Sequence, residues 1–258
     1  MPPNSDPETT AASPLARSTV PVGGIFLVSG PIGNLGDITL RAIETLRECD
    51  LIACEDTRHS LRLLERCQIG RKTTISYHEH NEASRTPELI QRALNGEKVA
   101  ILTDAGSPSI SDPGFRVAKA AREAGVPLTV LPGPSAVLTA LIGSGLPTDS
   151  FYFGGFLPVK SGRRERELSE ALARPHTSVY FESPHRLVKS LNVLASLAPE
   201  RPICVSRELT KKFETYHHGN AAEVAAEFTR LPAVKGEITL VIQGAGRQSR
   251  SAADRREP

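Results

Sequence analysis

The sequence predicts an α/β protein made of two domains, and two observations support this fold class. In the first half of the chain, short apolar runs alternate with segments whose apolar residues recur at helical spacing. The runs lie at residues 25–29, 51–54, 73–77, 98–103 and 128–131. Strands that alternate with helices indicate a mostly parallel sheet covered on both faces. The second observation is the segment GSGLPTDS at residues 143–150, whose glycines and proline interrupt the pattern before it restarts.

Capping residues predict where the helices of the first half begin. Asp37 is a good N-cap for a helix with apolar positions 38, 42, 43 and 46. A helical pattern of leucines follows at residues 61–64. Thr86 precedes Pro87, which favours a helix that begins there and runs to residue 94. Asp112 followed by Pro113 predicts the start of one more helix.

The second half repeats the alternation of strands and helices. Strands are expected at residues 151–156, 178–181, 203–206 and 237–243. Helices are expected at 161–173, from Ser183 and Pro184 to 197, and at 221–229. The sequence therefore divides into an N-terminal α/β domain at 23–146 and a C-terminal α/β domain at 147–244. The polar, low-complexity ends, residues 1–22 and 245–258, are expected to be disordered tails.

Composition narrows the class of protein. The 258 residues are 39% hydrophobic and 23% charged, as in ordinary globular proteins, and no apolar run is long enough to span a bilayer. The first 22 residues lack the pattern of a secretory signal, so a cytoplasmic location is expected. A formal net charge of +2 gives no general support for nucleic-acid binding, which must come from local clusters.

The cysteines do not indicate a metal site. Cys49, Cys54, Cys67 and Cys204 form no C-x-x-C pair, so we expect buried, reduced thiols. His78 and His80 are close in sequence, but no third ligand is specified. No metal is predicted.

Three loops at strand ends are candidates for ligand binding. They are residues 29–37, 104–114 and 131–136, all rich in glycine, proline and serine. The first loop carries neither G-x-G-x-x-G nor G-x-x-x-x-G-K-[ST], so dinucleotide and P-loop sites lose their main support. In the second loop, backbone N–H groups are available to bind the carboxylate of a small ligand. Asp104 is available to bind its cationic amine. The alternative for each loop is an ordinary turn.

Nine segments of the chain together resemble the tetrapyrrole (corrin/porphyrin) methylase family, and within it the branch that acts on ribosomal RNA. They occur in order over about residues 24–244. The segments are GPIGNLGDITLRA (30–42), DLIACEDTRHS (50–60), YHEHNE (77–82), DAGSPSISDPG (104–114), LPGPSA (131–136), SGLPTDSF (144–151), FESPHR (181–186), SRELTKKFE (206–214) and KGEITLVI (235–242).

The resemblance implies S-adenosylmethionine bound in a cleft between the two domains of a homodimer. It also implies 2′-O-methylation of a cytidine in the decoding region of 16S ribosomal RNA, free or in the 30S subunit. The cofactor-binding positions it implies are Pro31, Asp104, Ala105, Gly106, Ile110, Ser135, Ala136, Glu182 and Gly236. The chain lacks the G-x-G-P-G-D first loop and the S/G-G-D-P second loop of the tetrapyrrole enzymes, which favours the RNA branch.

Candidate catalytic residues follow two strands of the C-terminal domain. Methyl transfer to a hydroxyl is helped by a base or by a cation near the developing alkoxide. Glu182 or Glu208 is the candidate proton acceptor. The groups expected to orient the hydroxyl and the phosphate are His185, Arg186, Arg207 and Lys211.

Candidate RNA contacts fall in two places. Near the cleft we expect Glu55, Arg58, His78 and Asn81 to position the nucleotide. On the helix at 161–173, the phosphate-binding candidates are Lys160, Arg163, Arg164 and Arg166. The alternative for both groups is a set of solvated charges.

Three other functions are compatible with the sequence. One is a methyltransferase acting on a porphyrinoid ring. Another is a nucleotide-binding dehydrogenase, suggested by Glu55 and Asp56 after the second predicted strand. The third is a ribosome-binding module without catalysis.

Overall fold

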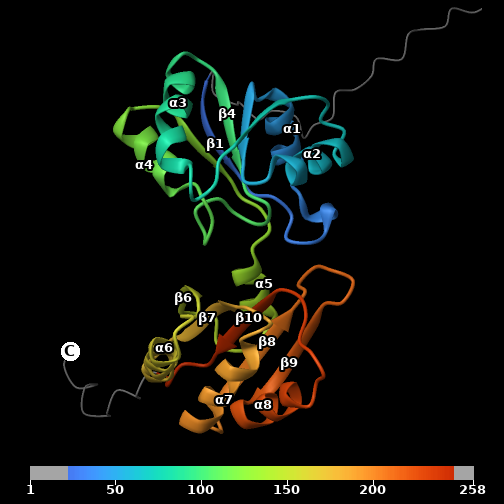
Figure 1. The fold of residues 1–258 in the computed structure, drawn as a ribbon, viewed down its shortest axis with the longest axis vertical. Coiled ribbons are helices and arrows are strands. Elements are labelled where there is room, and N and C mark those ends of the chain that lie inside the picture. The colour runs from blue at the N-terminus through green and yellow to red at the C-terminus, as the bar shows by residue number, and fades with distance from the viewer. Residues whose placement is uncertain (1–22, 247–258) are drawn as a thin grey trace, which may run out of the picture.

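The computed structural model describes residues 23–246, which form two α/β units, each built on a five-stranded sheet (Figure 1). Apart from residues 245 and 246, the tails expected at 1–22 and 245–258 lie outside the described residues. The fold class predicted from the alternating pattern is confirmed.

The first sheet contains β1 (Gly24–Val28), β2 (Leu51–Cys54), β3 (Thr73–Ser76), β4 (Lys98–Leu102) and β5 (Leu128–Leu131). Their spatial order is β3-β2-β4-β1-β5, and every neighbouring pair is parallel. All residues of β1 and β2 are buried, because helices cover both faces of the sheet.

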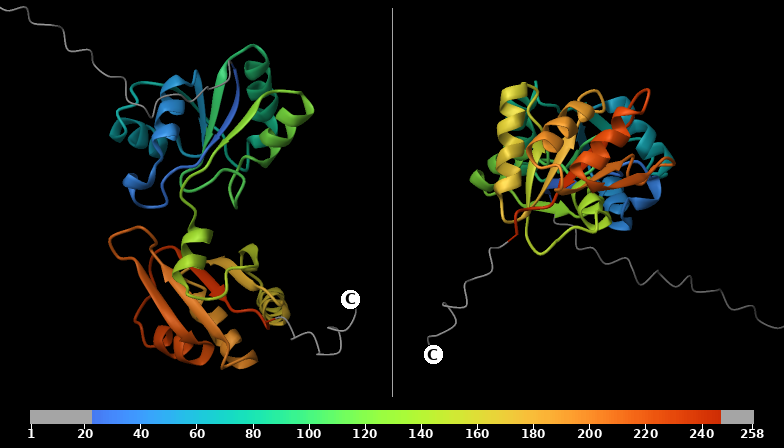
Figure 2. Two further views of the ribbon diagram at one scale, coloured as in Figure 1. Left: turned by 180° about the vertical axis from the view of Figure 1, so that it is seen from behind. Right: turned by 90° about the horizontal axis from the view of Figure 1, so that it is seen from below.

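Two helix pairs provide this cover. Helices α1 (Leu40–Glu48) and α2 (Thr57–Arg66) pack on one face, and α3 (Glu82–Leu94) and α4 (Phe115–Glu123) pack on the other (Figures 1 and 2). The connection after β1 therefore leaves on one face and that after β4 on the other. Since β1 and β4 are neighbours, their carboxyl ends form a topological switch point, where open α/β sheets bind ligands.

Several helices begin elsewhere than predicted. Helix α1 begins after Thr39, whose hydroxyl accepts a hydrogen bond from the N–H of Ala42, whereas Asp37 ends a short 3-10 turn. Helix α3 begins at Glu82, so Pro87 lies inside it. Thr86 does not cap this helix but donates its hydroxyl hydrogen to a carbonyl four residues earlier.

Two further predicted starts are displaced toward the C-terminus. The N-cap of α4 is Gly114 rather than Asp112. Helix α7 (Leu187–Leu197) begins after a turn that contains Ser183 and Pro184. In both cases the proline lies in the turn before the helix. A turn accommodates proline as well as the first helical position does.

The second sheet contains β6 (Phe151–Phe156), β7 (Thr177–Glu182), β8 (Pro202–Arg207), β9 (Thr215–Asn220) and β10 (Ile238–Ile242). Its order is β6-β7-β10-β8-β9, with only the β6–β7 pair parallel. Strand β9 was not predicted because TYHHGN shows no apolar alternation. Helices α6 (Ser161–Ala173), α7 and α8 (Ala221–Thr229) share one core with the sheet.

Helix α5 (Ala136–Gly143) covers the other face of this second sheet. Val137, Ala140 and Leu141 are buried in one cluster with Val179 of β7 and Val241 of β10. The core of the second unit thus includes residues that precede 147. We propose that the division at 146/147 lies instead just before α5, within the turn after β5.

All four cysteines are buried, as predicted. Desolvation raises the pKa of each thiol, that of Cys49 to about 12. Within residues 23–246, every helix is too short or too polar to cross a membrane.

Candidate active site

Three glycine- and proline-rich loops leave the first sheet side by side. The last residue of β1, Val28, pairs with Leu102 of β4 and with Leu131 of β5. Beyond the strands, Gly30 donates its N–H to the carbonyl oxygen of Gly106 at 2.8 Å. The three loops selected from the sequence therefore meet at the switch point.

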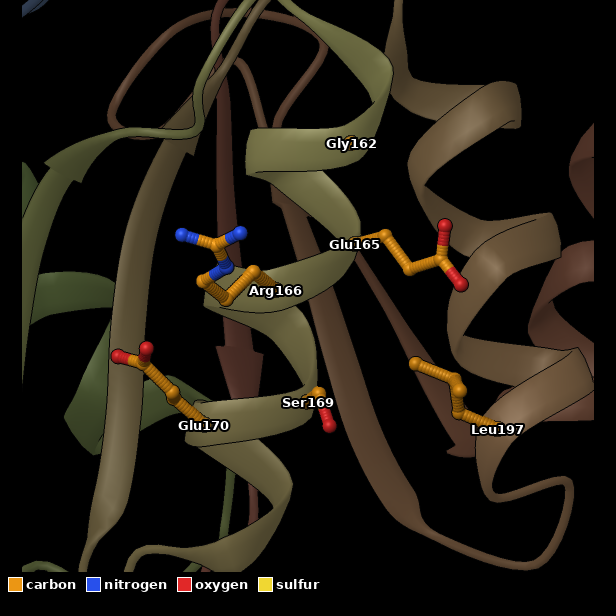
Figure 3. A pocket seen from close by; sticks show the side chains of 6 residues that line it. All are labelled: Gly162, Glu165, Arg166, Ser169, Glu170 and Leu197. Carbon is orange, nitrogen blue, oxygen red and sulfur yellow. The ribbon is translucent and has the colours of Figure 1, made fainter.

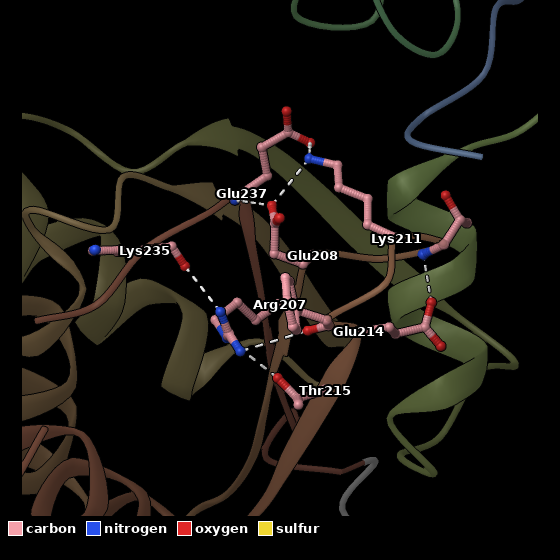
Figure 4. Close-up of polar contacts among 9 residues, drawn as sticks. Arg207, Glu208, Lys211, Glu214, Thr215, Lys235 and Glu237 are labelled. Carbon is pink, nitrogen blue, oxygen red and sulfur yellow. Dashed lines mark hydrogen bonds and ion pairs between the residues drawn. The ribbon is translucent and has the colours of Figure 1, made fainter. Parts of the chain in front are cut away.

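The opposite wall comes from the second unit. The side chain of Lys211, in the loop between β8 and β9, bonds Glu208 Oε1 and Glu237 Oε2 through its Nζ, both at 3.0 Å (Figure 4). Glu208 Oε1 also accepts the N–H of Glu237 at 2.9 Å. Desolvation alone lowers the pKa of Lys211, but the bonds to both carboxylates outweigh it and the pKa is raised. Lys211 is therefore a fixed cation.

Glu208 and Gly236 form one close contact in this wall. Backbone and Lys211 hydrogen bonds lower the pKa of Glu208, so it stays ionised. A Cβ on Gly236, whose φ is +92°, lies only 2.5 Å from the carboxyl carbon of Glu208. Gly236 is needed because a side chain there displaces this carboxylate.

A pocket of about 360 Å³ lies between the two walls. Its lining joins the first loop, helix α2 and the second loop to two residues of the second unit. The lining residues are Pro31, Ile32, Gly33, Leu35, His59, Arg62, Leu63, Arg66, Asp104, Ala105, Lys211 and Glu237. Ile32 also packs in a cluster with Leu209, which joins the two units beside the pocket.

Two carboxyl groups of the second loop, Asp104 and Asp112, interact electrostatically with Glu55. Desolvation, with the neighbouring charges of Glu55 and Asp104, raises the pKa of Asp112 to about 7. Desolvation and Asp104 likewise raise the pKa of Glu55. Among the described residues none of the three forms an ion pair, so they favour a bound cation.

Glu182 lies within the second unit rather than open to the pocket. Its side chain is 0% exposed and pairs with Arg186 at 2.8 Å. It also accepts hydrogen bonds from the Ser190 hydroxyl at 2.5 Å and the Ser183 N–H at 2.7 Å. These contacts occupy the carboxylate, and they favour a structural part for it over proton transfer.

The other basic candidates after β7 and β8 differ in position. Arg186 donates to the Leu157 carbonyl besides pairing with Glu182, and His185 is exposed. Arg207 donates to Thr215 Oγ1 and the Lys235 carbonyl oxygen, both at 3.3 Å (Figure 4). Arg207 thus fixes the β8–β9 loop that carries Lys211.

The RNA candidates of the first unit are held by local contacts. Arg58 is exposed and pairs with Asp56 at 2.9 Å. Asn81 precedes α3; its Oδ1 accepts the His78 N–H, and its Nδ2 lies 3.2 Å from His78 Nε2. Glu55 is one of the three electrostatically coupled carboxyl residues described above, with Asp104 and Asp112. Among these residues only Arg58 presents a cation at the surface.

The candidates on α6 divide into exposed and buried side chains. Lys160 and Arg163 are exposed, whereas Arg164 is 6% exposed and donates to the Val159 carbonyl oxygen. Arg166 lines a second pocket with two glutamates, over α6 and the end of α7 (Figure 3). The buried position of Arg164 makes it unavailable to RNA, because it packs toward the core.

The remaining predicted cofactor positions lie in the second and third loops. Ser135 caps α5 by accepting the N–H of Leu138, and Ala136 opens that helix. Ile110 is 46% exposed at the tip of the second loop. Sequence reasoning missed Leu35, Glu237 and three basic residues of α2, which line the pocket. The spacing of His59, Arg62 and Arg66 on one helix face was the signal available for the last three.

The chain matches the model of the family described as Tetrapyrrole (Corrin/Porphyrin) Methylases over residues 24–225. It therefore belongs to that family. Solved structures of the same fold include a uroporphyrin-III C-methyl transferase from Thermus thermophilus in complex with S-adenyl homocysteine (TM-score 0.57, 21% identity, 85% of this chain and 97% of that one). Another is the methyltransferase CobJ (TM-score 0.64, 18% identity, 86% and 95%).

Curated relatives are more similar in sequence and carry one name. The ribosomal RNA small subunit methyltransferase I of Mesorhizobium japonicum is 46% identical, over 89% of this chain and 78% of that protein. The protein of the same name from Vibrio cholerae is 45% identical, over 88% and 80%. Within the tetrapyrrole methylases, the chain belongs with these ribosomal RNA methyltransferases, which confirms the resemblance drawn from its motifs.

Proposed function

We propose that this protein transfers the methyl group of S-adenosylmethionine to the ribose 2′-hydroxyl of a cytidine in the decoding region of 16S ribosomal RNA. The observation that carries this proposal is the pocket at the switch point, which residues of both units line. The relatives named for ribosomal RNA methylation support the substrate.

The residues at the switch point fit a cationic methyl donor. Asp104 lines the pocket, and Glu55 and Asp112 interact with it electrostatically. An ammonium or sulfonium charge beside Asp104 offsets the repulsion among these three carboxyl groups, none of which forms an ion pair within residues 23–246. Turns at Pro31, at Ala105 to Ile110, at Ser135 and Ala136, and at Gly236 supply backbone groups around it. Bound there, S-adenosylmethionine supplies an electrophilic methyl group, so the chain's task is to position the hydroxyl.

Lys211 is the residue that we assign to the reacting hydroxyl. Glu208 and Glu237 hold its ammonium in place, and its raised pKa keeps it charged at neutral pH. A fixed cation stabilises negative charge that develops on the 2′-oxygen as the methyl group leaves sulfur. We assign the hydroxyl proton to the ionised Glu208 beside Lys211. Arg207 positions Lys211 through the loop, and Glu182 with Arg186 supports the neighbouring turn.

A porphyrinoid substrate is the second candidate, because solved neighbours of the fold include uroporphyrin enzymes. The cationic lining of α2 suits a phosphate chain as well as a polycarboxylate ring, so geometry alone does not separate them. The relatives favour RNA.

We also propose a homodimer acting in the cytoplasm. Val130 on edge strand β5, Leu138 and Ile142 on α5, and Phe156 on edge strand β6 are 49–74% exposed. Apolar side chains on edge strands and an adjoining helix are typical of a covered surface. We expect the purified protein to sediment at twice the monomer mass, and sedimentation as a monomer overturns the dimer.

One experiment tests the activity. The purified protein is incubated with methyl-labelled S-adenosylmethionine and, separately, with unmethylated 30S subunits, transcribed 16S RNA or uroporphyrinogen. We expect label in RNA, at a cytidine 2′-oxygen. Label in the porphyrinoid alone, or no transfer to any acceptor, overturns the proposal.

A further inference from the structure

Helix α2 presents a row of basic side chains to the pocket. His59, Arg62 and Arg66 are exposed and line it, with Leu63 among them. At 3.6 residues per turn these four positions lie within an arc of about 100°. The helix's one carboxylate, Glu65, lies outside this arc. We call His59, Arg62 and Arg66 the α2 basic face.

Two of the three α2 arginines lack a carboxylate partner among the described residues. Within residues 23–246, Arg62 and Arg66 take part in no ion pair, whereas Arg58, Arg85 and Arg92 each pair with a carboxylate. An arginine fork without a carboxylate partner is available to the oxygens of a phosphate. The α2 basic face therefore offers two free forks to a ligand in the pocket.

The rest of the pocket defines the ligand further. Its apolar lining comes from Pro31, Ile32 and Leu35 of the first loop, and Lys211 adds a cation from the opposite unit. Cations on both walls with apolar groups between them match a nucleotide whose neighbouring phosphates run along the rim. The helix α6 face fits this less well, because Glu165 and Glu170 adjoin Arg166 in its pocket (Figure 3).

We propose that the α2 basic face binds the phosphates that flank the target nucleotide and so holds a single-stranded stretch of ribosomal RNA over the pocket. This inference rests on the proposed function and names the surface that delivers its substrate. Arg62 and Arg66 bind phosphate oxygens, while Lys211 stays with the reacting sugar.

The test compares Arg62→Ala/Arg66→Ala with Lys119→Ala/Arg122→Ala, which removes the same charge from exposed positions of α4 on the other face of the sheet. Affinity for unmethylated 30S subunits and for transcribed 16S RNA is measured over a range of salt concentrations. Each lost phosphate contact lowers the slope of log K against log salt by about 0.7 for a single strand. We expect the α2 variant to lose about 1.4 from the slope and the α4 variant to match wild type.

Two further arms separate the possible failures. Arg62→Lys/Arg66→Lys keeps the charge, so its salt slope is expected to return to that of wild type, whereas a folding defect is not repaired this way. Calorimetry with S-adenosylmethionine is expected to give equal affinity in all variants. Equal slopes for both double alanine variants, or loss of cofactor affinity in the α2 variant alone, overturns the inference. Wild-type protein that transfers no methyl group to RNA overturns the proposed function instead.

Discussion

The side chain of Lys211 packs directly on Gly33, across the line where the two units meet. A Cβ built on Gly33 lies 2.3 Å from Cγ of Lys211. The cation that we assign to the reacting hydroxyl is therefore positioned by the first loop as well as by its two carboxylates. Any side chain at residue 33 must displace the side chain of Lys211.

Gly33→Ala is expected to lower methyl transfer to RNA by about tenfold or more, since a shift of about 1 Å at a reacting group costs up to 10²-fold. Gly33 has a φ of +150°, so alanine also costs about 1 kcal/mol of backbone strain. Gly70→Ala is the matched control, because its φ is +81° and its Cβ meets no atom within 4 Å. Equal activity of the two variants in a methyl-transfer assay rules out the packing argument.

Lys211→Met is expected to reduce the rate constant of transfer strongly while S-adenosylmethionine binds almost as before. The reason is that the ammonium acts on the acceptor oxygen, and removing one such donor costs about 10²–10³-fold. Calorimetry measures the cofactor and single-turnover assays the rate. Collapse of cofactor affinity in this variant instead places Lys211 in the cofactor site.

Glu182→Gln is expected to destabilise the protein by about 3 kcal/mol, because it leaves Arg186 without its buried counter-charge. Denaturant unfolding measures this, with the exposed Glu200→Gln as control. A variant of full stability that has lost methyl transfer shows that Glu182 is the proton acceptor after all.

Asp112 gives the fold a pH dependence of defined sign. Its pKa is raised from 3.8 to about 7, so the folded state binds the proton more tightly than the unfolded state does. Its contribution to stability is complete below about pH 4 and is lost as the pH rises to about 7. Asp112→Asn, which stays neutral, is therefore expected to gain melting temperature over wild type at pH 8 and little at pH 4. A gain that does not grow with pH, or an equal gain for the exposed Asp149→Asn, contradicts this assignment.

Arg163→Ala and Arg164→Ala separate RNA contact from packing on α6. Arg164 is buried, so its loss is expected to cost about 1–2 kcal/mol of stability without changing the RNA affinity of the folded protein. Arg163 is exposed, so alanine there is expected to leave stability unchanged. A loss of RNA affinity in this variant places α6 against the phosphate backbone. Thermal unfolding and RNA titrations of both variants provide the readout.

The fold and the loops at the switch point could be predicted because local patterns determine them. Buried parallel strands are continuous apolar runs, as at β1 and β2, and ligand loops follow their carboxyl ends. Strand β9 escaped prediction because its sequence is polar and its pairing with β8 is a long-range property.

The chemistry of single side chains depended on contacts that no local pattern contains. Glu182 was a catalytic candidate because it ends a strand of the second unit. Its carboxylate is instead bonded by Ser190 on helix α7 and by Arg186 just before that helix. Arg163 and Arg164 look equivalent in sequence. They differ in the face of α6 on which they lie, since Arg164 is buried and Arg163 is exposed. Arg62 and Arg66 are candidates because they line a pocket together with residues of the second unit, which is a long-range contact.

The four native thiols are expected to be unreactive toward maleimide dyes, since each is buried and its raised pKa keeps it protonated at neutral pH. Cysteines introduced at two exposed positions, residue 58 on α2 and residue 212 beside Lys211, thus become the only sites that a dye labels in the folded protein. A fluorophore pair there follows the separation of the two units in solution, molecule by molecule, while substrate arrives and product leaves.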